Sequence, residues 1–144
     1  LNKVKSLGIM ETVNANDANW KEQVLSLTSQ YGADVVIEAT GAVPVLGDSF
    51  DIIRRGGRIV VGSVYHSKAG DLSLLPIMRK ELTIVGAKGP YPKRDSDGQS
   101  STVRILNKLS NEISKLITVY EYKDALQAFD AMTGSSIKSV IRFD

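Results

Sequence analysis

The sequence contains no cysteine and a single histidine, His66, among its 144 residues. The lack of cysteine excludes a disulfide scaffold and any thiolate zinc site within these residues. It also fits a reducing compartment, so we expect a cytoplasmic protein. One loop histidine without neighbouring metal-ligand residues predicts a solvent-exposed side chain, and it leaves no Ser/His/Asp triad to assemble.

Charge of one sign and long apolar runs are also scarce. Lys and Arg total 18 and Asp and Glu total 16, which leaves a formal net charge of +2. This balance argues against nucleic acid or an anionic membrane as a partner. No apolar run approaches the ~20 residues of a membrane span. The hydrophobic fraction of 42% is typical of a globular domain.

The start of the chain resembles the end of a helix. Leu1, Val4 and Leu7 recur at helical spacing, and Gly8 follows as a candidate C-cap. Because natural N-termini rarely begin inside an element, we expect a piece of a longer protein. Residues 9–15 could form a weak strand.

Three short apolar segments that end in glycine alternate with helical spacing. They are residues 33–41, 58–62 and 82–86. Val35, Val36 and Ile37 predict a strand buried on both faces, as in parallel sheets. Helices are expected over residues 20–31, 43–53 and 74–80, with Gly56 and Gly57 ending the second. The alternation predicts an α/β fold with an open, Rossmann-like, doubly wound and mostly parallel sheet.

The pattern loosens after the third strand. Residues 89–98 predict a polar loop, and a helix is expected near residues 100–109 with Val103, Leu106 and Leu109 inward. A brief extended piece at residues 117–120 precedes an amphipathic helix over residues 121–132. Residues 137–143 alternate and predict a final strand.

Ligands of open parallel sheets bind beyond the carboxyl ends of the strands. Glycine at all three predicted strand ends therefore favours a ligand cleft, although one glycine alone could simply make a turn. The sequence has no G-x-G-x-x-G or Walker A phosphate loop. Glu38 could face a polar pocket, or it could cap a helix or form a surface salt bridge. From spacing alone, Lys138 is a solvated lysine on an edge strand.

An ordered set of segments resembles the cofactor domain of zinc-type medium-chain dehydrogenases, the alcohol, sorbitol and threonine dehydrogenase group. Residues 32–41 (GADVVIEATG) resemble its fourth strand, and residues 54–62 (RRGGRIVVG) its "R-x-G-G-x-x-V-x-V-G" segment. The remaining matches are residues 81–86, 122–129 and 137–141. The resemblance covers essentially the whole chain. It implies a partial nucleotide-binding domain over residues 1–112, and a returning helix and strand over residues 113–144.

The resemblance also implies site residues for NAD(H) or NADP(H). Thr40 and Gly41 would lie near the adenosine side, and Val61, Gly62 and Ser63 would line the nicotinamide pocket. Thr83 and Val85 would offer backbone groups to the carboxamide, and Lys138 would face the pyrophosphate.

The family's zinc ligands, its glycine-rich loop and its ribose-binding acid would precede Leu1. We therefore expect a piece of a zinc-dependent alcohol or polyol dehydrogenase that is inactive alone and forms part of a homo-oligomer. The alternative is a non-catalytic α/β module that acts through self-association. In the family's strand order, the strand at residues 35–39 would present an open apolar edge.

Overall fold

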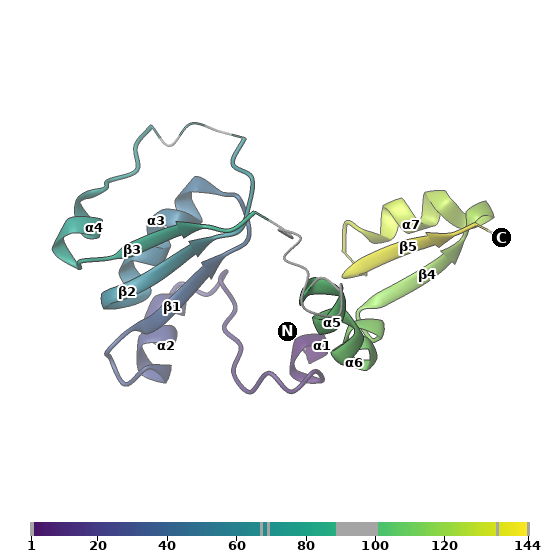
Figure 1. The fold of residues 1–144 in the computed structure, drawn as a ribbon, viewed down its shortest axis with the longest axis horizontal. Coiled ribbons are helices and arrows are strands. Elements are labelled where there is room, and N and C mark those ends of the chain that lie inside the picture. Colours follow the sequence, from purple (N-terminus) through teal and green to yellow (C-terminus); the bar gives the residue numbers. More distant parts are fainter. Residues whose placement is uncertain (1, 67, 69, 89–100, 135, 144) are drawn as a thin grey trace. The chain divides into compact units, whose positions relative to one another are not determined.

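The computed structural model describes residues 2–66, 68, 70–88, 101–134 and 136–143. The chain divides into two compact units. The first unit spans Glu11–Tyr91, and the second combines Asn2–Met10 with Pro92–Asp144. Each unit contains a parallel sheet and helices, so the predicted α/β class is confirmed (Figure 1).

The first unit contains a three-stranded parallel sheet in the order β1-β2-β3. The strands are β1 (Ala33–Glu38), β2 (Ile53–Val61) and β3 (Thr83–Gly86). Helix α2 (Trp20–Leu27) precedes the sheet, whereas α3 (Val43–Ile52) and α4 (Leu75–Arg79) connect its strands. The predicted alternation of strands and helices is therefore confirmed. Pro44 lies in the first turn of α3, where its fixed φ suits a helix start.

The core of the first unit lies between α3 and the sheet. Phe50, Ile53 and Ile59 are only 3%, 2% and 0% exposed. Partly buried apolar side chains surround them: Val36, Leu46, Val61, Leu72, Ile77 and Leu82. Burying a large apolar side chain contributes about 1.5–3 kcal/mol, so these three residues form the main stabilising contact of the unit.

The opposite face of β1 is open. Val35 and Ile37 are 51% and 70% exposed, so the prediction of a strand buried on both faces is wrong. The reason is visible in Figure 1, where α3 lies on one face of the sheet and the unit's described helices leave the other uncovered. β1 also lies at an edge of the described sheet, which gives the expected open apolar edge.

Strand β2 begins five residues earlier than the sequence predicts, at Ile53. Ala33 pairs with Ile53 and Val35 with Arg58, so residues 54–57 bulge opposite Asp34 alone. Gly56 and Gly57 therefore lie inside this bulge, and α3 already ends at Ile52. The adjacent ion pair between the Arg54 Nε and Asp34 Oδ1 atoms, 2.5 Å apart, bridges the two strands at this irregularity.

The expected strand at residues 9–15 does not form, because this part of the described chain has no neighbouring strand to pair with. Met10 is 88% exposed. The expected helix end before it is confirmed, since α1 (Asn2–Lys5) is followed by Gly8 at a φ of 87°.

The second unit contains helices α1, α5 (Ser101–Lys108), α6 (Ser110–Ser114) and α7 (Ala125–Ala131). Its two strands, β4 (Ile117–Glu121) and β5 (Lys138–Arg142), pair in parallel, with Ile117 opposite Lys138. A 3₁₀ turn, η1 (Tyr122–Asp124), leads into α7, which makes that helix shorter than expected. The expected loop at residues 89–98 lies outside the described residues.

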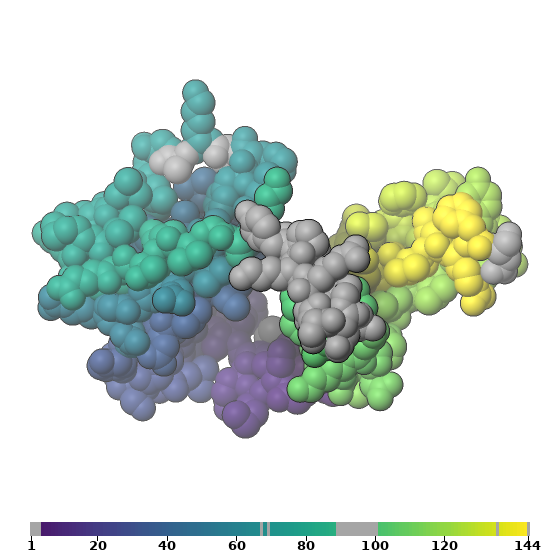
Figure 2. Space-filling model, in the orientation of Figure 1, coloured from purple at the N-terminus to yellow at the C-terminus, as the bar shows by residue number. Residues whose placement is uncertain are grey.

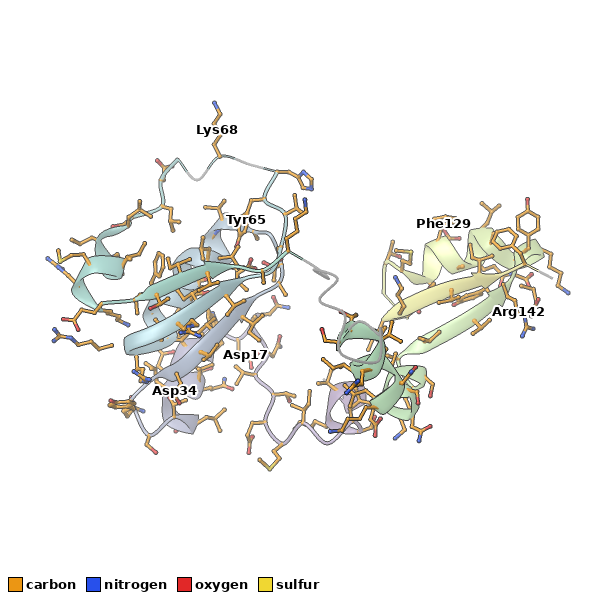
Figure 3. All side chains as sticks on the ribbon, in the orientation of Figure 1. Asp17, Asp34, Tyr65, Lys68, Phe129 and Arg142 are labelled. Carbon is orange, nitrogen blue, oxygen red and sulfur yellow. The ribbon has the colours of Figure 1, made fainter. Side chains whose placement is uncertain are left out.

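Apolar side chains that the sequence pattern places inward are exposed in the second unit. Val103, Leu106 and Leu109 are 45%, 49% and 42% exposed, which contradicts the predicted burial. The apolar stripe of α7 is also exposed, whereas Ala128 packs inward at 2% exposure. Figure 3 shows Phe129 on the outer side of α7. Helix α7 contacts β4 and β5 mainly through small side chains, so its large ones face solvent.

None of the helices in the described ranges is long and apolar enough to cross a bilayer.

Candidate cofactor site

The carboxyl ends of the three parallel strands in the first unit meet at one edge of the sheet. Glu38 pairs with Val61, and Val61 pairs with Gly86. The segments that follow these residues therefore start side by side, where open parallel sheets bind their ligands. The pairing is extended by two backbone hydrogen bonds, from the Gly62 N–H to the Glu38 carbonyl (2.9 Å) and from the Ala87 N–H to the Val61 carbonyl (2.8 Å).

Glu38 is the centre of a hydrogen-bond network at the end of β1. Its side chain is buried, at 2% exposure, although it is a carboxylate. The Oε1 atom accepts hydrogen bonds from the Thr40 N–H at 2.6 Å and from the Thr40 hydroxyl at 2.5 Å. A longer bond comes from the Gly41 N–H at 3.2 Å, and the Tyr65 hydroxyl donates to Oε2. Because a buried carboxylate needs such donors, the network fixes the turn after β1.

The same network sets the protonation states of both side chains. Burial alone would raise the pKa of Glu38, but the donors from Thr40, Tyr65 and Gly41 lower that pKa below its usual value. Burial, followed by the hydrogen bond to the Glu38 carboxylate, raises the pKa of Tyr65 to about 12. The pair therefore holds a charged carboxylate and a neutral phenol at neutral pH.

Gly41 allows the segments after β1 and β2 to touch. Its φ is 74°, and a Cβ atom at this position would lie 2.6 Å from the Val64 carbonyl oxygen. Both the backbone conformation and the short distance require glycine. The turn at residues 39–41 and the segment at residues 62–64 are thus packed directly against each other.

A cavity of about 590 Å³ opens at the ends of β2 and β3. It is lined by Val61, Gly62, Ser63, Val64, Gly86, Ala87 and Lys88. A Cβ atom added to Gly86 would meet nothing within 4 Å, so a ligand can approach the backbone there. The expected pocket residues Val61, Gly62 and Ser63 all lie in this wall.

Family membership rests on a match over most of the chain. Residues 1–100 match the family described as zinc-binding dehydrogenase. The chain belongs to this family.

The sorbitol dehydrogenase of Halalkalibacterium halodurans is 29% identical over 143 residues, which cover 98% of this chain and 40% of that protein. The D-arabitol-phosphate dehydrogenase of Enterococcus avium is 29% identical over 139 residues, covering 95% of this chain and 38% of that protein. The chain thus spans about two fifths of the length of these relatives.

Solved structures of dehydrogenases share the fold. Benzyl alcohol dehydrogenase from Acinetobacter calcoaceticus has a TM-score of 0.78 at 20% identity, over 100% of this chain and 40% of that one. A short chain alcohol dehydrogenase from E. coli CFT073, complexed with cofactor NADH, has a TM-score of 0.72 at 15% identity. That match covers 99% of this chain and 41% of the E. coli chain. The strand order β1-β2-β3 corresponds to the last three strands of the 3-2-1-4-5-6 order expected of such a sheet.

The remaining expected site residues of this zinc-binding dehydrogenase chain lie outside the cavity at the β2 and β3 ends. Thr40 lines a separate cavity of about 420 Å³ together with Glu38 and Trp20. Thr83 begins β3 opposite Arg58, and Val85 pairs with Val60, so Thr83 lies toward the amino end of the strand. Lys138 is exposed at the start of β5, in the second unit.

Two features of the site were not resolved by the sequence. Glu38 lines a pocket. Within the described part of the chain it forms neither of the alternative contacts, since helix α3 has no side-chain cap and the donors to Glu38 are uncharged. Tyr65 was not recognised as a site residue. The sequence offers one signal, its position three residues after Gly62, the glycine that follows β2.

A larger cavity of about 670 Å³ lies between α3 and the segment before α4, and no sequence motif pointed to it. Its walls include Pro44, Phe50 and Leu72. It is on the helix side of the sheet, so it is separate from the strand ends where the cofactor is expected.

The residues of the first unit fit part of a nicotinamide cofactor, because exposed glycines and the Ser63 hydroxyl border the cavity. They do not fit zinc. Within the described residues, no cluster of three or more His, Cys, Asp or Glu side chains could hold a metal, and His66 is exposed.

Proposed function

We propose that this chain is the cofactor-binding part of an alcohol or polyol dehydrogenase that uses NAD(H) or NADP(H) and zinc. The observation that carries the proposal is the cavity at the ends of β2 and β3, at the sheet edge where such folds bind ligands. Residues 1–112 would form the partial nucleotide-binding domain. Residues 113–144 would return to a catalytic domain.

In this proposal Val61, Gly62 and Ser63 lie beside the nicotinamide ring. Thr40 and Gly41 contact the adenosine side, and backbone groups of Thr83 and Val85 bind the carboxamide. Lys138 supplies a cation for the pyrophosphate. The cavity at the ends of β2 and β3 supports the assignment of the nicotinamide-side residues most directly, because Val61, Gly62 and Ser63 all line it.

The reaction we propose for the whole enzyme moves a hydride from the alcohol carbon to the nicotinamide ring, while the hydroxyl proton leaves. Zinc, when bound, lowers the pKa of the alcohol oxygen. The chain's own contribution is to bind and orient the nicotinamide ring. The names of its relatives favour a small alcohol or polyol as the substrate.

We expect these 144 residues alone to be inactive and to bind NADH weakly, because the chain has neither a glycine-rich phosphate loop nor a zinc-ligand set. Calorimetry should give a dissociation constant well above the micromolar range, and absorbance should show no reduction of NAD with sorbitol. Micromolar affinity for NADH would contradict the expectation that the phosphate-binding loop lies outside these 144 residues. Sorbitol-dependent turnover would contradict the expected inactivity.

A non-catalytic module that self-associates is the second candidate. It is favoured by the exposed Val35 and Ile37 on edge strand β1, which could pair with another copy. A homo-oligomer is also compatible with the first proposal. Light scattering combined with a binding measurement can exclude the second candidate: a monodisperse monomer that binds nicotinamide mononucleotide excludes the self-association module.

A further inference from the structure

The hydroxyl of Tyr65 donates a hydrogen bond to the buried carboxylate of Glu38. We propose that Tyr65 is a positioning residue, which acts through Glu38 to hold the wall at residues 62–64 in the shape that receives the nicotinamide ring. This inference rests on the proposed function, because it gives that wall its ligand. It assigns a role to the segment after β2 that neither the fold nor the family match supplies.

Glu38 holds both ends of the wall. At the start, the Gly62 N–H donates to the Glu38 backbone carbonyl at 2.9 Å. At the end, Tyr65 follows Val64 directly and its hydroxyl reaches the Glu38 side chain. Gly62, the first anchor, and the two residues between the anchors, Ser63 and Val64, all line the cavity. Figure 3 shows Tyr65 in the segment that follows β2.

The turn after β1 contacts the middle of the wall. The Val64 carbonyl oxygen lies 2.6 Å from where a Gly41 Cβ would be, so the turn after β1 supports the wall from behind. That turn is itself held by Glu38, through the N–H and hydroxyl groups of Thr40. One buried carboxylate therefore fixes the supporting turn and the last anchor of the wall together.

The hydrogen bond between Tyr65 and Glu38 is also favoured electrostatically. The donors to the Glu38 carboxylate are hydroxyl and backbone N–H groups, and its pKa is lowered. A charged acceptor makes the phenol hydrogen bond stronger than a neutral one would be. Ordering a mobile segment when a ligand binds costs free energy. A wall that is already ordered avoids this cost and therefore raises the affinity for the nicotinamide ring.

The test compares Tyr65→Phe with Tyr31→Phe in the 144-residue chain. Phenylalanine keeps the ring of Tyr65 and removes only its hydroxyl. Tyr31 is 72% exposed and precedes β1, so it is the matched control at the other end of the sheet. The probes are nicotinamide mononucleotide and AMP, measured by equilibrium dialysis. Heteronuclear NMR relaxation reports the backbone order of Ser63 and Val64.

Tyr65→Phe should weaken binding of nicotinamide mononucleotide by about three- to tenfold, because ligand binding must then also order the wall. AMP binding should change less than about twofold, since AMP has no nicotinamide ring. The order parameters of residues 63 and 64 should fall from rigid values of about 0.85 toward about 0.6. Tyr31→Phe should change none of these quantities.

Unchanged mononucleotide binding in Tyr65→Phe overturns the inference, as does equal weakening of both probes. Failure of the unsubstituted chain to bind the mononucleotide at all is the separate failure of the proposed function. In that case, relaxation still decides whether Tyr65 positions the wall: unchanged order at residues 63 and 64 overturns that part as well. Retained circular dichroism excludes unfolding as the cause.

Discussion

The two units of the chain differ in how they bury their apolar side chains. The first unit encloses Phe50, Ile53 and Ile59 between α3 and the sheet, each at 3% exposure or less. In the second unit, Ala128 is the only apolar side chain among the described residues that is buried to this degree. In the space-filling view the teal residues of β3 cover part of the first unit, and the yellow residues of β5 lie at the surface of the second (Figure 2).

This contrast shows that elements can form without a core of their own. Helix α7 carries a stripe of large apolar side chains, Leu126, Phe129 and Met132, at 80%, 62% and 63% exposure. The rings of Tyr122 and Phe143 are in tilted contact, with centroids 5.0 Å apart, yet both side chains are mainly exposed. A two-stranded sheet is marginally stable without further packing. We infer that the first unit supplies most of the stability of the isolated chain.

The largest expected effect comes from emptying the core of the first unit. Ile59→Ala should destabilise it by about 3–4 kcal/mol, because it removes a fully buried side chain and leaves a cavity. Phe129→Ala, on the exposed face of α7, should cost less than about 0.5 kcal/mol. Urea unfolding followed by fluorescence of Trp20, the single tryptophan, measures the first unit. Equal losses in both variants would remove the distinction between the units.

A glycine substitution sharpens the account of how β1 begins. Gly32 has a φ of 91°, and a Cβ atom at this position would lie 2.8 Å from the backbone nitrogen of Arg54. Gly32→Ala should therefore cost about 2–3 kcal/mol, the sum of strain and a backbone clash.

Gly56→Ala is the matched control in the same unit. Its φ is 67°, but the nearest atom is the end of the flexible Arg54 side chain, at 3.4 Å. The cost should be nearer 1 kcal/mol, roughly the strain alone. Equal unfolding midpoints in urea for the two variants would mean that the strand pairing at Gly32 relaxes freely.

These two units also mark how far the sequence could predict the structure. The order of strands and helices, and the expected wall at Val61, Gly62 and Ser63, follow from local patterns and from the resemblance. Burial does not follow from them, because it depends on what covers each face. Val35, Ile37 and Phe129 have the apolar character of buried residues, yet they are exposed and the described residues provide no layer over them.

The hydrogen-bond network around Glu38 could not be predicted from the sequence either. The residues that meet there, Glu38 and Tyr65, are 27 positions apart, and their contact depends on the register between β1 and β2. No spacing rule in one sequence brings them together. The lowered pKa of Glu38 is a consequence of that tertiary contact.

A smaller effect concerns pH. The pKa of Tyr65 is raised from 10.0 to about 12, so its stabilising contribution is complete below pH 10 and is lost as the pH rises through 12. At neutral pH, Tyr65→Phe should cost about 1–2 kcal/mol, the contribution of a hydrogen bond to a charged group.

The difference between Tyr65→Phe and the unsubstituted chain should shrink as the pH rises from 10 toward 12. Urea titrations at several pH values measure this difference directly. A gap that stays constant over the same range would show that the phenol does not donate to Glu38.

The smallest expected effect is at the end of α3. The Lys80 ammonium group donates to the carbonyls of Phe50 and Ile53, at 2.6 and 2.8 Å, and so caps that helix. Lys80→Met should cost about 0.5–1 kcal/mol, as expected for a cation at a helix C-terminus. Lys68→Met, which removes an exposed lysine from the same unit, is the control and should leave Trp20 unfolding unchanged.

We propose that the nicotinamide end of the cofactor binds where β2 and β3 end. This assignment can be tested by proton–nitrogen correlation NMR spectra of the 144-residue chain, recorded while nicotinamide mononucleotide is added. We expect the largest amide shifts at residues 62–64 and 86–88, which line the cavity at the ends of β2 and β3. Amide shifts concentrated instead at Gly47, Phe50 and Leu72, in the larger cavity beside α3, would contradict this assignment.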